Sequence, residues 1–352
     1  MSKKIMKNNL GNKDNFITFA SFVCAIMIVG LHSYNSESLP LNSGTRFVEA
    51  VFSHGLFTGA VPIFLFISAY LFYRNVNNIK DCFVKQKKRV VSVVMPFFAW
   101  STFYYLVFAL GNKVAGISMV EGVDVSFLGV VKGILFYEYC FPLWFLWQLM
   151  VYILISPIVF LLLSKRNISI VVLSCLAVLG LLGMKLEADI WGSTRMLINI
   201  NYFAYYFAGC FMAKNNDIFD KIKKFILKLP LLPLILTYLA FGVLGGLVYE
   251  EYILTFNKRC IVPIVAIALW ALLYKIYSLK NNIKVPEKIS TMIIYAIHPF
   301  IGLVVGKVLG VLPIPLIVSY FVGFLVCVIL SCVTALIMRY IKPIYWVFSG
   351  NR

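Results

Sequence analysis

The chain has three histidines, and two of them lie at or within apolar segments. His32 ends the run IMIVGLHS, His298 lies in YAIHP, and His54 falls between two apolar runs. Imidazole takes up and releases a proton near neutral pH, so it is the most common general base in enzymes. An ionisable group within a membrane span costs a few kcal/mol or more, which makes it a functional candidate. His32 and His298 are therefore candidates for acid–base chemistry.

Each histidine also has a structural interpretation. His32 could cap the C-terminus of a helix, where the helix dipole favours a cation. His298 precedes Pro299, and its ring could hydrogen-bond a backbone carbonyl that the proline leaves free. We expect His54, in a loop, to be solvated. Position alone leaves both interpretations open for His32 and His298.

A cationic cluster, KQKKR, ends at Lys88 and Arg89 and is followed by Pro96 and an aromatic run. One interpretation is the ordinary positive anchor at the cytoplasmic end of a span. The other is a cytoplasmic phosphate clamp, because a helix start and cationic side chains both attract anions.

Four further polar or aromatic residues stand out near the ends of apolar runs. Trp144 fits an interfacial aromatic belt, and Gln148, one turn further in, requires a hydrogen-bond partner. Arg195 could bind an anion or pair with Asp189. Ser68 and Gln148 are candidate donors to a developing oxyanion.

The cysteines indicate neither a disulfide framework nor a metal site. Six of the eight lie in or beside apolar runs, and no two have CxxC or zinc-ligand spacing. We expect them to be buried as small apolar side chains.

Composition places these residues in a membrane protein. The chain has 352 residues, of which 61% are hydrophobic and 13% charged, and its mean hydropathy is +0.90. Soluble domains contain about 25% charged residues, which argues against a water-soluble multidomain enzyme. The net charge of +18 comes in short clusters between long apolar runs, which argues against nucleic-acid binding.

A span needs about 20 mostly apolar residues, and lipid-exposed backbone favours helices. We therefore predict an all-α polytopic protein that forms a single domain over 1–352. Residues 16–33 are interpreted as a retained first helix rather than a signal peptide. Ten segments qualify as spans: 16–33, 56–73, 90–110, 144–163, 168–184, 197–213, 230–248, 260–277, 289–309 and 314–337.

The charges of the connecting segments predict the orientation. With the N-terminus inside, the inner segments hold three quarters of the Lys and Arg residues, and the outer loops hold most of the acidic ones. This alternation follows the positive-inside rule. It predicts that both termini lie on the cytoplasmic side.

Taken together, these segments resemble the acyltransferase 3 family of membrane-bound acyltransferases. The family has about ten helices, and its motifs match this chain in order. They are a histidine ending the first helix (His32), a Phe-rich second helix with a Ser-Gly-Tyr-like turn (Ser68-Ala69-Tyr70), a basic pair before a proline (Lys88-Arg89 and Pro96), Leu-Trp-Phe-Leu (Leu143–Leu146) and Tyr-x-x-His-Pro (Tyr295–Pro299). The chain departs from the family at Ser21, where members commonly have Arg or Lys, at Gly59-Ala60, where an arginine often stands, and at Ala69.

The resemblance implies transfer of an acyl group, usually acetyl from cytoplasmic acetyl-CoA, to a hydroxyl of a cell-surface or lipid-linked saccharide. His32 would take the hydroxyl proton or carry the acyl group itself, and Lys88 and Arg89 would hold the CoA phosphates. We expect the remaining candidates to bind substrate or line a tunnel: His298, Trp144, Gln148, Ser68 and Arg195. No bound cofactor or metal is expected, since acetyl-CoA or another acyl-CoA is a donor substrate.

The expected surroundings are a bacterial inner membrane, an acyl-CoA donor, a saccharide or lipid-linked glycan acceptor and an envelope-biosynthesis partner protein, with no nucleic acid. Three alternatives remain open. A transporter or flippase for a glycan or small solute explains ten spans and buried polar groups equally well. The others are the membrane half of a sensor or racemase-like protein, and an inactive member of a polysaccharide export complex, which the missing basic residue at Ser21 favours.

Overall fold

The protein is described by a computed structural model that covers residues 2–40, 43–114, 123–190, 193–249, 258–280, 283 and 289–350. Within these residues the fold is almost entirely helical, with one β-hairpin. An all-α polytopic membrane fold is therefore confirmed.

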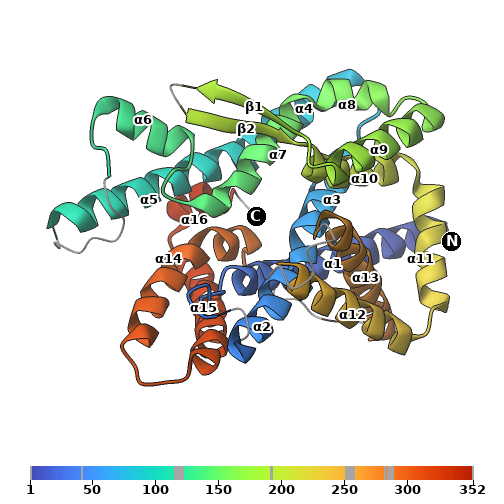
Figure 1. Cartoon of the computed structure of the whole chain (residues 1–352). Helices are drawn as coiled ribbons and strands as arrows, with labels where there is room; N and C mark the ends of the chain where they lie inside the picture. The colour runs from blue at the N-terminus through green and yellow to red at the C-terminus, as the bar shows by residue number, and fades with distance from the viewer. Residues whose placement is uncertain are drawn as a thin grey trace.

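The helices form two layers that α3 connects (Figure 1). The first layer is built from the two ends of the chain: α1 (Ser2–Leu31), α2 (Gly44–Ala50), η1 (Val51–Leu56), η2 (Phe57–Gly59), α3 (Ala60–Tyr73), α12 (Leu231–Tyr249), α13 (Lys258–Leu279), α14 (Thr291–Gly310) and α15 (Leu316–Met338). The second layer is built from the middle of the chain: α4 (Ile79–Arg89), η3 (Val90–Val94), α5 (Met95–Val114), α6 (Phe127–Leu135), η4 (Phe141–Leu143), α7 (Trp144–Leu154), α8 (Ser156–Leu162), α9 (Arg166–Leu181), β1 (Lys185–Ile190), β2 (Ser193–Asn199) and α10 (Ile200–Lys214).

Six helices in the described residues are long and apolar enough to cross a membrane, and a seventh crossing results if a bent pair forms one span. The six correspond to the predicted segments 56–73, 90–110, 230–248, 260–277, 289–309 and 314–337. The bent pair, Phe141–Leu154 and Ser156–Leu162, corresponds to 144–163, while 16–33 and 168–184 match shorter apolar helices, Asn15–Leu31 and Arg166–Leu181. Segment 197–213 corresponds to α10, which has 15 residues. The predicted count of ten spans is therefore not confirmed.

Two of the predicted spans begin too late. The second runs as one helical stretch from Gly44 to Tyr73, and the third runs from Ile79 to Gly111. The sequence missed these extensions because their first turns carry charged residues: Arg46 and Glu49 in one, and the KQKKR cluster in the other. Asn78 caps the stretch that begins at Ile79, since its side chain accepts a hydrogen bond from the backbone N–H of Asp81 (3.1 Å).

The 62° bend between α7 and α8 follows from Pro157, which cannot continue the helical hydrogen bonds. The carbonyls exposed at the bend have side-chain donors. Gln86 Nε2 donates to Ile153 O (3.0 Å) and Leu154 O (3.1 Å), and Tyr73 donates from its hydroxyl to Ser156 O (2.9 Å). Gln86, in the middle of the cationic cluster, therefore anchors α4 to this bend.

The antiparallel hairpin β1–β2 replaces the start of the predicted span 197–213. The strand continues to Asn199, whose side-chain oxygen accepts hydrogen bonds from the N–H groups of Asn201 (3.1 Å) and Tyr202 (3.3 Å). Asn199 thus caps α10 and fixes where the strand ends and the helix begins.

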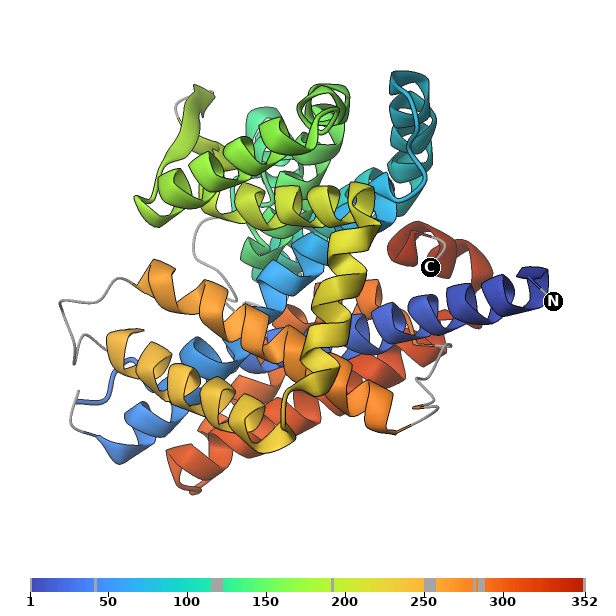
Figure 2. The same cartoon turned by 90° about the vertical axis from the view of Figure 1, so that its right-hand side faces the viewer.

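Contacts between connecting segments agree with the predicted orientation. Arg166 forms an ion pair with Asp217 (2.7 Å), and Lys214 donates a hydrogen bond to Val76 O. All four residues belong to segments predicted to be cytoplasmic. α11 (Asn216–Lys228) buries Phe219 and Ile226, and the two chain ends lie on the same side of the helices, as do α16 (Lys342–Ser349) and α1's first turns (Figure 2).

Glycines allow the closest helix contact in the first layer. A Cβ on Gly55 would overlap the carbonyl oxygen of Gly242, and one on Gly246 would lie 2.7 Å from Val51 Cα. Small residues spaced in this way let helix backbones approach directly in membranes. The contact holds α12 against η1, next to the residues that line the site.

Candidate functional site

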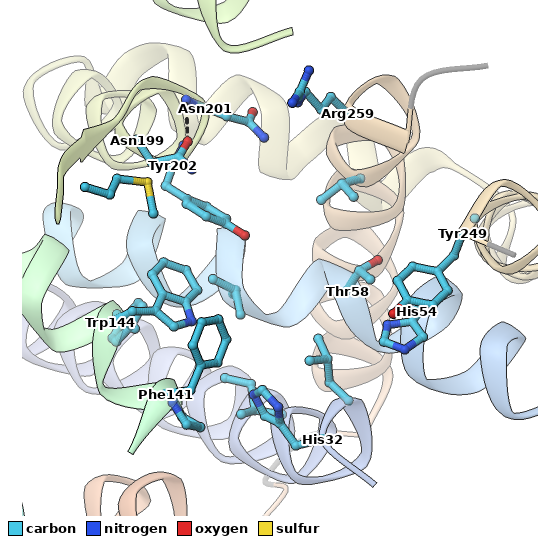
Figure 3. A pocket seen from close by; sticks show the side chains of 18 of the residues that line it. His32, His54, Thr58, Phe141, Trp144, Asn199, Asn201, Tyr202, Tyr249 and Arg259 are labelled. Atoms are coloured by element: carbon cyan, nitrogen blue, oxygen red, sulfur yellow. Dashed lines mark hydrogen bonds between the residues drawn. The ribbon is translucent and has the colours of Figure 1, made fainter. Parts of the chain in front are cut away.

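A cavity of about 470 Å³ lies between the two layers, and we call it the outer cavity. Its walls come from both layers, with His32 on one side and Trp144, Tyr202 and Arg259 on the others (Figure 3). Lys185 and Arg259, from segments predicted to be outside, line it too. The cavity therefore extends from the outer side of the protein to the end of α1.

The outer cavity combines aromatic faces with polar groups. The rings of Trp144 and Tyr202 lie 4.6 Å apart, and Asn199, Asn201 and Thr58 contribute amide and hydroxyl groups. A largely apolar pocket with a few polar groups is the usual form of a small-molecule site.

His32 follows the last residue of α1, and its side chain is not used to cap that helix. Ser33 Oγ donates to Val29 O (2.9 Å), and Ser53 Oγ donates to Gly30 O (2.7 Å). No described residue hydrogen-bonds to the imidazole of His32, which is exposed to the cavities. The capping interpretation of His32 is therefore wrong, because two serine hydroxyls satisfy these carbonyls.

A second cavity, of about 440 Å³, lies between α1, α14 and α15, and we call it the α14–α15 cavity. It shares His32, Phe141 and Pro142 with the outer cavity and also has His298 in its wall. The ring centroids of His32 and His298 are 5.2 Å apart. The fold thus brings together two histidines from opposite ends of the chain.

His298 hydrogen-bonds the carbonyl that Pro299 leaves free, as one of the two sequence interpretations predicted. Its Nδ1 lies 2.6 Å from Tyr295 O, which would otherwise accept from the N–H of residue 299. A carbonyl only accepts, so Nδ1 carries the proton and Nε2 is an acceptor. His298 is 1% exposed, and its Nε2 has no hydrogen-bond partner among the described residues.

Tyr104 hydrogen-bonds the backbone of α14 beside Pro299. Its hydroxyl donates to Ala296 O (2.8 Å) and accepts from the N–H of Phe300 (3.1 Å). These two backbone groups would normally bond each other. A side chain from α5 therefore hydrogen-bonds the backbone on both sides of Pro299, at the turn that carries His298, and sequence analysis gave no signal for this role.

Trp144 and Ser68 line cavities near His32. Trp144 lies in the outer cavity. Ser68 lines a narrow cavity of about 50 Å³ that shares Ile28, Phe145 and Tyr295 with the outer cavity. Both residues therefore remain candidates for substrate contact.

Gln148 is a structural residue instead. Its Nε2 donates to Met196 O (3.1 Å) and Leu197 O (3.2 Å), and its Oε1 accepts from the hydroxyl of Tyr152 (2.9 Å) and the N–H of Asn199 (3.0 Å). Three of these four bonds anchor β2 and the fourth is with Tyr152 of α7. The predicted partner therefore exists, but no group of the amide remains for an oxyanion.

Neither Lys88 nor Arg89 lines the two cavities that contain His32. Arg195 belongs to β2, where it pairs in register with Ala188, and its side chain is outside the described residues. Lys88 is exposed, and the Arg89 guanidinium lies over the ring of Phe72, 6.0 Å from its centroid. Neither Lys88 nor Arg89 forms an ion pair with a described residue.

His54 is not a solvated loop residue, contrary to expectation. It lies in η1, lines the outer cavity and stacks on Tyr249 with ring centroids 3.5 Å apart. The helix that begins at Gly44 includes this residue, which the sequence had assigned to a loop.

Within the described residues, no group of three His, Cys, Asp or Glu side chains could hold a metal ion. The eight cysteines all have free thiols, and five of them are buried. The chain is thus a polytopic helical membrane protein whose internal cavities meet at a pair of histidines.

Comparison of the sequence with known protein families assigns the chain to one of them. The model of an acyltransferase domain, Acyl_transf_3, matches residues 14–336. The chain therefore belongs to the acyltransferase 3 family, and the family indicates a membrane acyltransferase. No curated protein and no solved structure matches the chain.

Proposed function

We propose that the protein transfers an acyl group, acetyl in the simplest case, from cytoplasmic acyl-CoA to a hydroxyl of a cell-surface or lipid-linked saccharide. The observation that carries this proposal is the position of His32. Its imidazole is free of hydrogen bonds to described residues and lies in the walls of two cavities. In a reaction between two substrates, the catalytic group must be accessible to both, and the His32 imidazole meets this requirement because it borders both cavities.

The donor approaches from the cytoplasmic side. Lys88 and Arg89 lack acidic partners among the described residues, which leaves them available for the phosphates of CoA. Arg89 contacts Phe72, and Ser68 lies one turn away on the same face of α3. The narrow cavity at Ser68 shares three residues with the outer cavity. We propose that the pantetheine arm follows this path to His32.

The acceptor approaches from the outer side, where Lys185 and Arg259, from segments predicted to be outside, line the outer cavity. His32 then removes the proton of the acceptor hydroxyl, or carries the acyl group in an intermediate. In the first case the hydroxyl oxygen bonds to the acyl carbon, the C–S bond breaks, and the CoA thiolate leaves and takes the proton from His32. In the second case an unprotonated His32 nitrogen bonds to the acyl carbon, the C–S bond breaks and CoA leaves as the thiolate. The acceptor hydroxyl oxygen then bonds to the acyl carbon, the C–N bond to His32 breaks, and the CoA thiolate takes the hydroxyl proton.

This reaction places the protein in a bacterial cytoplasmic membrane, where acyl-CoA is present on one side and envelope glycans are assembled or exported on the other. An envelope-biosynthesis protein that supplies or receives the glycan is the expected partner.

The test measures O-acetyl content of surface polysaccharide in a deletion strain complemented with wild type, His32→Ala or His54→Phe. Labelled acetyl-CoA added to isolated membranes gives the same comparison in vitro. We expect His32→Ala to abolish transfer. His54→Phe also changes the wall of the outer cavity but keeps an aromatic ring on Tyr249. It should lower transfer far less than His32→Ala, which makes it the matched control for loss of an imidazole.

Two outcomes would overturn the proposal. Unchanged acetylation in every strain, with glycan export altered, would support a transporter. Restoration of acetylation by His32→Ala would keep the family activity but remove His32 from its centre.

A further inference from the structure

The Nε2 atom of His298 is a buried hydrogen-bond acceptor for which no described residue is a donor. Its Nδ1 is committed to Tyr295 O, so Nε2 is unprotonated, and no described residue donates to it. A buried polar atom without a partner destabilises the folded protein, because it has lost its hydrogen bonds to water. Such an atom beside a proposed catalytic group indicates a partner that this conformation does not yet supply.

His32 is the neighbouring side chain that has a donor to give. Neutral imidazole has one N–H and one unprotonated nitrogen, and the His32 ring has no other described hydrogen-bond partner. Each histidine thus has what the other lacks. His32 can supply an N–H, and His298 can accept it only at Nε2.

The separation of the rings already fits this bond. Two imidazoles joined by an N–H···N bond of about 2.9 Å have ring centres roughly 5 Å apart, since each nitrogen lies about 1 Å from its ring centre. The observed separation is 5.2 Å, with the ring planes tilted by 30°. Rotation of the His32 ring about χ2, a torsion that is broad for histidine, is the movement that would turn its N–H toward His298 Nε2.

We propose that His298 is a positioning residue for His32, which donates an N–H to His298 Nε2. The chain of contacts runs from Tyr295 O to the His298 Nδ1–H, then from His298 Nε2 to the His32 N–H. It fixes the tautomer of His32, so that its second nitrogen is unprotonated and can face the substrates. This inference rests on the proposed function for the role of that nitrogen.

The arrangement serves both proposed roles of His32. As a base, His32 takes the hydroxyl proton and becomes a cation, and its N–H bond to His298 becomes charge-assisted and stronger. As an acyl carrier, it needs the attacking nitrogen unprotonated, which the same bond ensures. In neither role does a proton move to His298, which stays neutral throughout.

The first test reads the tautomer directly and does not depend on activity. With three histidines in the chain, the ring nitrogens of protein labelled with ¹⁵N-histidine, purified without a histidine tag and placed in lipid nanodiscs, are assigned by solid-state NMR from single substitutions. In wild type and His54→Phe we expect one His32 tautomer with one hydrogen-bonded N–H. In His298→Phe we expect the two His32 tautomers to coexist.

The second test uses acetyl transfer and a pair of matched variants. His298→Phe keeps a planar ring without an acceptor, while His298→Gln keeps an acceptor oxygen. We expect His298→Phe to lower kcat about 10- to 100-fold, the range of a hydrogen bond to a charged group, with the KM for acetyl-CoA changed less than threefold. His298→Gln should recover at least a tenth of the wild-type kcat.

The outcomes separate this inference from the proposed function. Two coexisting His32 tautomers in wild type, or equal kcat in His298→Phe and wild type, would overturn the inference while transfer by wild type still supports the function. A single hydrogen-bonded His32 tautomer in a wild-type protein that transfers no acyl group would overturn the function and leave the histidine pair established. Equal loss in His298→Phe and His298→Gln, with reduced thermal stability in both, would mean that His298 is only a packing residue.

Discussion

Replacing Pro299 with alanine should stabilise the protein and impair it at the same time. Pro299 lacks an N–H, which leaves Tyr295 O free to accept from His298 Nδ1 at 2.6 Å. The alanine in Pro299→Ala supplies that N–H at the position where an α-helix directs it. It therefore competes with His298 for the carbonyl and releases the constraint on the His298 tautomer.

The two effects have different sizes. A proline in a helix interior costs about 3 kcal/mol or more, but Tyr104 already satisfies Ala296 O and Phe300 N beside Pro299. The gain in stability should therefore lie between zero and about 3 kcal/mol. The lost hydrogen bond of His298 is worth about 0.5–1.5 kcal/mol, which corresponds to a roughly two- to thirteenfold decrease in correctly oriented His298 and hence in kcat.

The assay pairs thermal unfolding of the purified protein with acetyl transfer from labelled acetyl-CoA. Pro263→Ala is the matched control, because Pro263 also lies inside a membrane helix, α13, and neither His32 nor His298 bonds to the carbonyl that it frees. It should stabilise the protein without lowering kcat. Loss of stability in Pro299→Ala in proportion to its loss of activity, or an unchanged kcat, would refute the reasoning.

Three other substitutions test the contacts around the site. Gln148→Leu removes four hydrogen bonds, three to β2 and one from Tyr152, and should lower the unfolding free energy by about 2–4 kcal/mol, measured by chemical denaturation in detergent. Gln86→Leu at the α7–α8 bend is a second case, and no change would mean that water replaces these bonds. Gly55→Val forces η1 away from the Gly242 backbone and should destabilise the folded protein by more than about 3 kcal/mol, seen as loss of monodisperse protein. Gly306→Val is its control and should be tolerated, because a Cβ at Gly306 meets no atom within 4 Å. Arg89→Gln should raise the KM for acetyl-CoA about tenfold with little change in kcat, measured from initial rates at two salt concentrations; an effect confined to kcat would contradict a phosphate-binding role.

Sequence reasoning located the membrane helices because lipid imposes a simple rule. A segment that crosses the bilayer must be apolar over about 20 residues, and loops retained inside are rich in Lys and Arg. It failed at helix ends that carry charge, as at Gly44–Glu49, and at α10, where a strand precedes the helix. Hydropathy does not report hydrogen bonds, and those bonds decide both cases.

The sequence predicted which residues belong to the candidate site better than it predicted how they are arranged. His32 and His298 were identified because ionisable groups are costly in apolar segments, and the bond from His298 to a freed carbonyl followed from Pro299 by local geometry alone. Gln148 was equally conspicuous as a polar residue, yet it anchors a hairpin. A residue's type states which bonds it can make, whereas the neighbours it bonds to come from other elements.

The sequence by itself determined that this is a polytopic helical protein with motifs of a known family and imidazoles in costly positions, and it predicted the orientation of the helices. Those properties depend on short-range patterns and on the bilayer. Only the tertiary structure decided that the rings of His32 and His298 are neighbours, that Tyr104 hydrogen-bonds the backbone of α14 beside them, and that two cavities meet at His32. These features arise from packing between helices that are distant in the chain, and no local pattern encodes which helices become neighbours.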